Sequence, residues 1–228
     1  MQSIDKRYRA ASGLQARRDY SIFYSQILPC RVLVLGWNPG GNPQTWSESE
    51  LASTSFFENG EHEYVDCHYP LAVVMRTFLI KALALRSAED IRTIPKTNLI
   101  FRRSRGQDSL AVSDEKAFSE ARPFVEEIIQ QVQPTTIILE GTKTLGAFAA
   151  KYCETVEPCA DGDPITTPNG RVPASIYQLS NATIRCLGRP AQLLGLGHPS
   201  RYATRAEWPL VLERSRRALL TACAIHDA

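Results

Sequence analysis

Two short loops carry the residues that could do chemistry. The first loop, Gly36–Asn42, contains Asn38, and the second, Gly195–Ser200, contains His198 directly before a proline. Glycine lets the backbone approach a ligand closely and proline stiffens a turn, so each loop can hold a polar side chain in place. An amide can orient a water molecule, and an imidazole can donate a hydrogen bond to a developing negative charge. Taken singly, both loops are also ordinary, because such turns are common and a lone histidine is usually structural.

The sequence patterns of several other site classes are missing. No GxxxxGK[ST] or GxGxxG pattern supports a nucleotide site, and no GxSxG elbow supports a serine nucleophile. The six cysteines contain no CxxC pair, so we expect reduced, mostly buried thiols instead of a zinc or disulfide framework. His62 and His68 could bind a metal, but their spacing fits no strong motif. We expect no metal and no cofactor.

Strand and helix patterns alternate along the chain. Short apolar runs predict strands, and longer amphipathic or apolar stretches predict helices. The predicted strands are 31–36, 97–101, 135–140, 175–179 and 192–196, the predicted helices are 71–86, 113–132, 141–152 and 204–223, and 158–173 is turn-like. This alternation predicts an α/β fold in three α/β/α layers, with a central, mostly parallel sheet and a ligand site beyond the carboxyl ends of its strands.

Length and charge bound the class of protein. A chain of 228 residues with 43% apolar residues is sufficient for one core, so we expect a single domain over 1–228. Residues 1–30 form a basic amino-terminal extension and 43–70 an acidic insertion. Arginines outnumber lysines, which suits phosphate contacts. No apolar run is long enough for a membrane span or a signal peptide, so we expect a soluble, cytoplasmic protein.

The two loops together resemble the uracil-DNA glycosylase superfamily. The residues that carry the resemblance are Gly-Trp-Asn-Pro-Gly at 36–40 and Gly-His-Pro-Ser at 197–200. Between them, Thr97–Phe101 is similar to the strand of that family that presents a base-reading asparagine, and Pro134–Phe148 resembles its next strand and helix. The similarity spans about 31–208, although only the two loops are diagnostic.

The resemblance implies a role for each matching residue. Asn38 would position the attacking water and His198 would donate a hydrogen bond to the anionic oxygen of the leaving base. Asn98 would read the Watson–Crick edge of a flipped base. Around these, the implied base pocket and DNA-binding positions are Gly36, Trp37, Ser200 on a phosphate, Arg201 or Tyr202 as the wedge that fills the gap, and Arg102 and Arg103. Iron–sulfur branches of the family place cysteines where this chain has Arg102-Arg103 and Glu120-Ala121-Arg122, so no cluster is expected.

The chain departs from the family at the aromatic residue that stacks on the flipped base. No Pro-Phe pair follows the first loop at the usual distance, so Trp46, Phe56 and Phe57 are equal candidates, and core packing explains each of them as well. The acidic insertion also carries residue types that bind sugar hydroxyls, namely Glu58, Asn59, Glu61 and Asp66. A glycosylated base is therefore conceivable, but a solvated acidic loop is the favoured interpretation.

The function implied is a DNA glycosylase that flips uracil or a modified pyrimidine out of DNA and hydrolyses its N-glycosidic bond. DNA is the expected partner, with no membrane and no obligate protein partner. Three alternatives stay open: a defence glycosylase that acts on hypermodified phage DNA, a non-catalytic reader of damaged or modified DNA, and a hydrolase or transferase of small nucleotides. The reader arises because Asn38 is not a carboxylate.

Overall fold

The fold is described from a computed structural model of the whole chain. It describes residues 1–14, 18–41, 47, 60–104, 110–159, 166–167, 170–171, 177–202 and 208–224, without the side chains of 166–167, 170–171, 200, 202 and 221–224. Among these residues, no helix combines the length and the apolar character that a membrane span needs.

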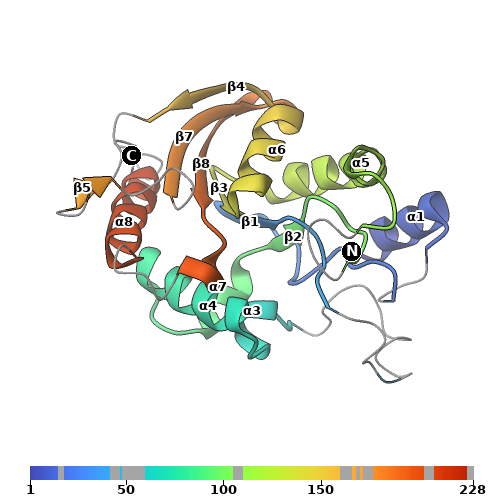
Figure 1. Cartoon of the computed structure of the whole chain (residues 1–228), viewed down its shortest axis with the longest axis horizontal. Coiled ribbons are helices and arrows are strands. Elements are labelled where there is room, and N and C mark those ends of the chain that lie inside the picture. The colour runs from blue at the N-terminus through green and yellow to red at the C-terminus, as the bar shows by residue number, and fades with distance from the viewer. Residues whose placement is uncertain are drawn as a thin grey trace.

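A central sheet positions everything else (Figure 1). Its strand order, among the described residues, is β2-β1-β3-β8-β7-β4. The bounds are β1 Val32–Gly36, β2 Lys96–Asn98, β3 Thr136–Glu140, β4 Cys153–Pro158, β7 Tyr177–Ile184 and β8 Arg189–Leu196. Strands β2, β1, β3 and β8 are parallel, while β7 and β4 complete the sheet in antiparallel fashion. A separate small ribbon pairs β5 Thr166–Thr167 with β6 Gly170–Arg171.

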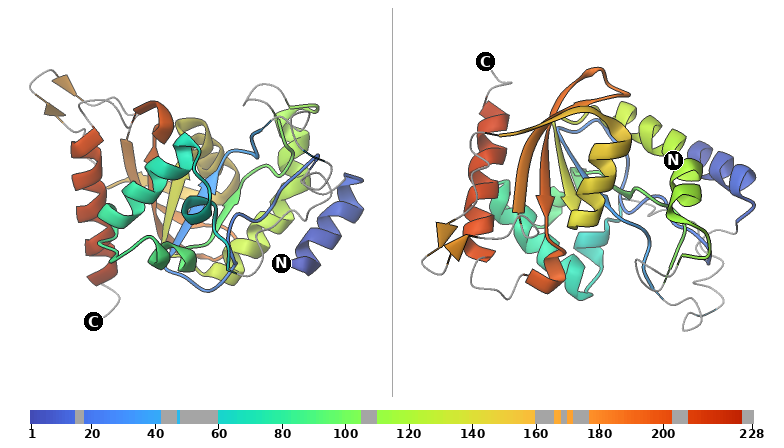
Figure 2. Two further views of the ribbon diagram at one scale, coloured as in Figure 1. Left: turned by 90° about the horizontal axis from the view of Figure 1, so that it is seen from below. Right: turned by 45° about the horizontal axis from the view of Figure 1, so that its top comes forward.

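Helices cover both faces of the sheet, which confirms the predicted three-layer α/β/α architecture (Figure 2). Side chains that alternate along β1 show the two layers: Leu33 and Leu35 face one core, and Val32 and Val34 face the other. The first core includes side chains of α1 Gln2–Ser12, α5 Asp114–Val132 and α6 Thr142–Tyr152. The second includes side chains of α3 Glu63–Asp66, α4 Pro70–Ala82, the 3-10 helix η2 Glu89–Thr93 and α8 Trp208–Ala224. The short helix α7 Pro199–Tyr202 follows β8.

Local chemistry sets several helix boundaries. Ser113 caps α5 by accepting a hydrogen bond from the Lys116 backbone N–H at 3.3 Å. The helix ends at Gln133, whose left-handed backbone (φ 55°) precedes Pro134. Pro70 occupies the first turn of α4, where its missing N–H costs nothing. These are the boundaries that the sequence predicted to within a few residues.

The antiparallel half of the sheet differs from the predicted alternation. Strands β7 and β8 form a hairpin whose turn contains Gly188 at φ 60°, so no helix separates them. Strand β4 was not predicted because it is an edge strand with only Cys153 buried, which removes the apolar alternation that identifies a strand.

The amino-terminal segment belongs to the fold. Residues 1–30 were expected as a basic extension, but Ile4 and Tyr8 of α1 are buried in the first core. The Tyr8 ring makes edge-on contacts with Tyr20, Phe101 and Phe124 at centroid distances of 5.0, 5.1 and 5.6 Å. Lys6, Arg7 and Arg9 lie on the exposed side of this packed helix.

Candidate active site

The first loop is fixed against the segment that follows β2. The backbone N–H groups of Leu99 and Ile100 donate to the carbonyls of Gly36 and Trp37, each at 2.9 Å. The amide nitrogen of Asn38 donates to Pro39 O at 3.0 Å, Arg102 O at 3.3 Å and Ser104 Oγ at 2.7 Å. Because all three partners accept, the NH₂ group is committed to the loop, and the Asn38 oxygen is the atom left to accept a hydrogen bond.

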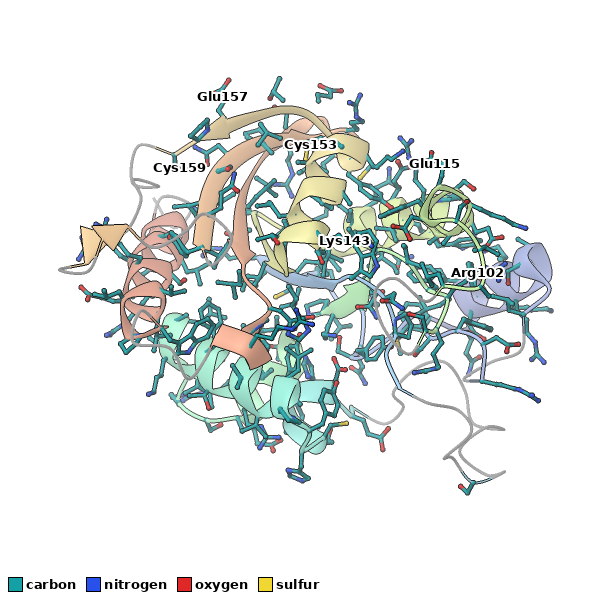
Figure 3. All side chains as sticks on the ribbon, viewed as in Figure 1. Arg102, Glu115, Lys143, Cys153, Glu157 and Cys159 are labelled. Carbon is teal, nitrogen blue, oxygen red and sulfur yellow. The ribbon has the colours of Figure 1, made fainter. Side chains whose placement is uncertain are left out.

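Trp37 lies in the first core beside the loop. It is buried and packs edge-on against Phe118, with ring centroids 5.2 Å apart. The ammonium of Lys143, in the first turn of α6 (Figure 3), lies 4.2 Å from the centroid of the Trp37 ring. The Trp37 side chain is therefore part of the core, and its backbone carbonyl accepts the hydrogen bond from Ile100.

Gly36 and Asn98 meet at the carboxyl ends of the two neighbouring strands, where they are paired in register. A Cβ atom at Gly36 would lie only 2.2 Å from Asn98 Oδ1, so the Asn98 side chain occupies the space that glycine leaves. Asn98 is 3% exposed, yet within the described part of the chain its amide makes no hydrogen bond. The amide atoms of Asn98 are not among the fully inaccessible polar atoms that lack a partner, so a ligand at this edge of the sheet can reach them.

Glu140, which the sequence analysis did not single out, lies in the same place. It ends β3, is 5% exposed, and would approach a Cβ at Gly36 to 2.9 Å through Oε2. Its Oε1 accepts a hydrogen bond from the Tyr64 hydroxyl, and its Oε2 lies 3.4 Å from Lys96 Nζ. The rule that strand ends carry chemistry could have found Glu140, since it closes a predicted strand.

Lys96 is a buried cation shared by two carboxylates. Its Nζ is paired with Glu63 as well as with Glu140, and it lies 4.4 Å from the centroid of the Tyr24 ring. Burial disfavours the charged form, but the Glu140 and Glu63 carboxylates outweigh it and raise the pKa of Lys96. Burial raises the pKa of Glu63, against the opposing effect of Lys96. Asn98 and Glu140 reach the same space over Gly36, so this charged cluster adjoins Asn98 through Glu140.

His198 follows the end of β8 and is partly buried. Burial lowers the pKa of its imidazole, although the nearby Glu140 carboxylate acts in the opposite direction. The side chain is therefore a neutral imidazole at neutral pH. The Arg201 backbone N–H donates to the His198 carbonyl at 2.9 Å, which fixes the turn into α7. The parallel strands thus bring Gly36, Asn98, Glu140 and His198 to one edge of the sheet.

The arginines expected to contact DNA differ in whether their guanidinium groups are already paired within the protein. The Arg102 guanidinium binds Glu120 through Nε at 2.5 Å and Nη2 at 2.9 Å, and its side chain is only 13% exposed. Arg103 donates to the Gly40 carbonyl and so supports the first loop. Arg201 is exposed on α7, next to the His198 turn. Arg201 is therefore better placed for a phosphate than Arg102.

Several expected residues lie outside what the structure describes. These are the aromatic candidates Trp46, Phe56 and Phe57, the insertion residues Glu58 and Asn59, and the side chains of Ser200 and Tyr202.

The described end of the acidic insertion is structural. Asp66 accepts two hydrogen bonds from the Arg92 guanidinium, at 2.7 and 2.9 Å, which lower its pKa and occupy its carboxylate. His62 is fully buried: Nδ1 accepts from the Tyr64 backbone N–H at 3.0 Å, and Nε2 faces the Ile94 carbonyl at 2.9 Å. Both ring nitrogens are taken, so His62 is not available to a metal.

Among the residues that the structure describes, no three or more His, Cys, Asp or Glu side chains are placed to hold a metal ion.

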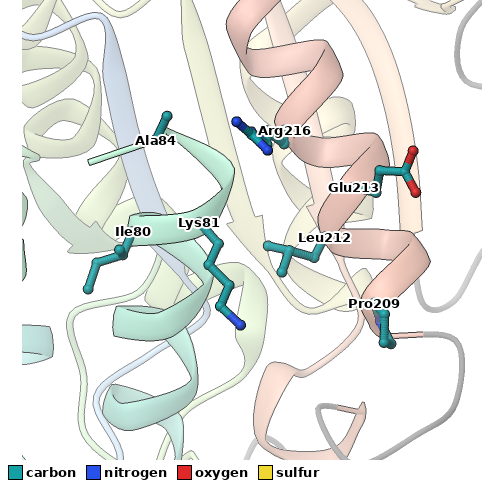
Figure 4. A pocket seen from close by; sticks show the side chains of 7 residues that line it. All are labelled: Ile80, Lys81, Ala84, Pro209, Leu212, Glu213 and Arg216. Atoms are coloured by element: carbon teal, nitrogen blue, oxygen red, sulfur yellow. The ribbon is translucent and has the colours of Figure 1, made fainter. Parts of the chain in front are cut away.

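A groove elsewhere on the molecule is distinct from this site. It lies between α4 and α8, has a volume of about 430 Å³ and is mainly apolar (Figure 4). The lining residues are Ile80, Lys81, Ala84, Pro209, Leu212, Glu213 and Arg216. None of the candidate site residues borders it.

The chain matches no protein-family model and no curated protein. The interpretation of the site therefore rests on its geometry and on the two loop motifs.

Proposed function

We propose that this protein is a DNA glycosylase that extrudes a damaged or modified pyrimidine and hydrolyses its N-glycosidic bond. The observation that carries the proposal is the Asn98 amide, which is only 3% exposed, makes no hydrogen bond within the described part of the chain and is still open to a ligand. An amide presents a donor and an acceptor side by side, which matches the Watson–Crick edge of a flipped base. Asn98 is paired in register with Gly36 of the first loop, and it lies at the same edge of the sheet as the loop that contains His198, which supports the same proposal.

The chemistry would be divided between the two loops. The bond between C1′ and the base nitrogen breaks, and its electron pair leaves with the base. A water oxygen bonds to C1′ and releases a proton to solvent. The neutral His198 imidazole donates a hydrogen bond to the base oxygen on which the negative charge develops. The Asn38 oxygen accepts a hydrogen bond from the water and orients it, but an amide does not take up the proton. Stabilisation of the leaving group would therefore carry most of the catalysis.

The test is the formation of abasic sites. Oligonucleotides that contain uracil, a thymine–guanine mismatch, 5-hydroxymethylcytosine or its glucosylated form are incubated with excess protein, heated in alkali and scored for strand breaks. We expect breaks in at least one substrate, and a loss of about 10²–10³ in rate for His198→Ala. His68→Ala, an exposed histidine outside the site, is the matched control and should retain the wild-type rate.

A non-catalytic reader is the second candidate, because the Asn38 amide is locked in the loop and offers no base for the water. Selective binding of one substrate with no strand breaks, at any protein excess, would support the reader and remove the glycosylase.

A further inference from the structure

Two oxygen atoms converge over Gly36. A Cβ at this position would lie 2.2 Å from Asn98 Oδ1 and 2.9 Å from Glu140 Oε2. Both side chains are nearly inaccessible, 3% exposed for Asn98 and 5% for Glu140. The proposed reaction uses the Asn98 amide, but it gives no role to a carboxylate beside it.

Glu140 is held firmly in this place. The Tyr64 hydroxyl donates to Oε1, and Lys96 Nζ lies 3.4 Å from Oε2. The same ammonium is shared with Glu63, so the cluster has two carboxylates for one cation. Carboxylate oxygens have several lone pairs, and Oε2 can accept another hydrogen bond beside Lys96. A ligand that brings a hydrogen-bond donor would fit this cluster, and one that brings another acceptor would be repelled.

Cytosine-type and uracil-type pyrimidines differ in the hydrogen-bonding group that they carry at C4. Cytosine-type bases carry an amino group at C4, which donates, and uracil-type bases carry an oxygen, which accepts. Glutamate and aspartate accept hydrogen bonds from the cytosine amino group in protein–DNA complexes. We infer that Glu140 is a specificity-determining residue that selects pyrimidines with an amino group at C4. Because unmodified cytosine is a normal constituent of DNA, the substrate would carry its modification elsewhere on the ring, at C5.

This inference rests on the proposed glycosylase function, so the experiment separates the two. Matched pairs of bases share the substituent at C5 and differ only at C4: 5-methylcytosine with thymine, and 5-hydroxymethylcytosine with 5-hydroxymethyluracil. Each is placed in the same single-stranded oligonucleotide, which removes differences in base-pairing energy from the comparison. Abasic-site formation is then measured in single turnover with excess protein. We expect the amino member of at least one pair to react about 10- to 100-fold faster than its oxo partner.

The variant Glu140→Gln keeps the shape of the side chain but offers an amide. Its NH₂ group can donate to the C4 oxygen, so the preference should fall by at least about 10-fold or reverse. Glu63→Gln is the matched control, because it also removes one carboxylate from Lys96 but leaves Glu140 in place. It should keep the preference for the amino member, because Glu140 Oε2 is still present to accept a hydrogen bond. The wild-type ratio is informative even if Glu140→Gln does not fold.

Each outcome has one meaning. A faster reaction of the amino member, lost in Glu140→Gln and kept in Glu63→Gln, supports the inference. Equal or faster reaction of the oxo member, or an unchanged ratio in folded Glu140→Gln, overturns the inference and leaves the glycosylase proposal standing. If neither these bases nor the uracil, mismatch and glucosylated substrates yield abasic sites, the glycosylase proposal fails and the inference falls with it.

Discussion

At the scale of the residue, the site depends on groups that are buried together at the cost of their solvation. Asn98, Glu140 and Lys96 are each at most 5% exposed. Only Lys96 and Glu140 compensate each other directly, with Glu63 as a second anion. Tyr64 holds Glu140 through a hydrogen bond, and the lack of a side chain at Gly36 leaves room for the side chains of Asn98 and Glu140. Small changes at these residues should therefore affect function more than surface substitutions do.

Gly36→Ala should disable the site. The new Cβ would lie 2.2 Å from Asn98 Oδ1 and 2.9 Å from Glu140 Oε2, so both side chains must move. We expect base excision to be lost and the free energy of unfolding to fall by about 1–3 kcal/mol. Gly40→Ala is the control in the same loop, since no atom lies within 4 Å of its added Cβ. Single-turnover excision and urea unfolding of both variants test this, and wild-type excision by Gly36→Ala would contradict it.

His62 should make stability depend on pH. Burial lowers its pKa to about 4, from an ordinary value of 6.5. Between these two values the unfolded chain binds more protons than the folded one, so stability is complete above pH 6.5 and falls as the pH decreases towards 4. The loss from this residue should approach about 3 kcal/mol. Urea unfolding at several pH values should show a shallower dependence for His62→Gln than for the wild type, whereas the exposed control His68→Gln should follow the wild type. Parallel curves for His62→Gln and the wild type would contradict this account.

At the scale of the element, the predictable parts of the fold are those in which local pattern and tertiary role agree. Strands β1 and β3 were predicted from sequence because each is a short, mainly apolar run that is buried at every position. Helix α5 was predicted because a capping serine precedes a regular spacing of apolar residues. Asn98 and His198 were identified from the resemblance of their segments to the uracil-DNA glycosylase superfamily. The structure places Asn98 at the end of β2, three residues before the predicted end of that strand, and His198 two residues after β8. Lys96 and Glu63 could not be identified, because a charged residue reads as exposed until its partner, far away in the sequence, is known. Edge strand β4 was not predicted because five of its six residues are not buried, so its sequence lacks the apolar pattern of a strand.

The contact between β8 and α6 depends on the lack of a side chain at Gly195. A Cβ there would lie 2.5 Å from Leu145 Cδ2 and 3.3 Å from Leu145 Cβ, in a closely packed core. Gly195→Ala should lower the free energy of unfolding by about 1–3 kcal/mol. Gly146→Ala, on the exposed side of α6 with no atom within 4 Å, should raise it by about 0.5–1 kcal/mol, because alanine favours the helix. Thermal unfolding should move in opposite directions for the two variants, and equal shifts would contradict the packing described.

At the scale of the whole molecule, the sheet separates support from function. The candidate site lies at the carboxyl ends of the parallel strands β1, β2, β3 and β8, as expected for an α/β sheet. The antiparallel strands β7 and β4 extend the sheet on one side and contribute none of the candidate site residues. DNA would therefore approach the edge of the sheet at which the two loops and α7 lie.

If DNA binds at this edge of the sheet, Arg201 and Arg102 should differ in their effect on the salt dependence of binding. Arg201 is exposed beside the site, so Arg201→Gln should weaken binding and reduce the slope of log K against log salt by about 1. Arg102 is already paired with Glu120, so Arg102→Gln should lower stability and leave the slope unchanged. Titrations of an oligonucleotide at several salt concentrations distinguish the two, and the reverse pattern would place the DNA on another face.

The most direct test of the central claim is mass spectrometry of intact oligonucleotides after a single turnover with excess protein. The claim predicts that one modified-base substrate loses the mass of its base and gains that of a hydroxyl group, with the free base in solution, and that His198→Ala leaves the substrate intact on the same timescale. Oligonucleotides of unchanged mass throughout the substrate panel, despite selective binding by the wild-type protein, would contradict it.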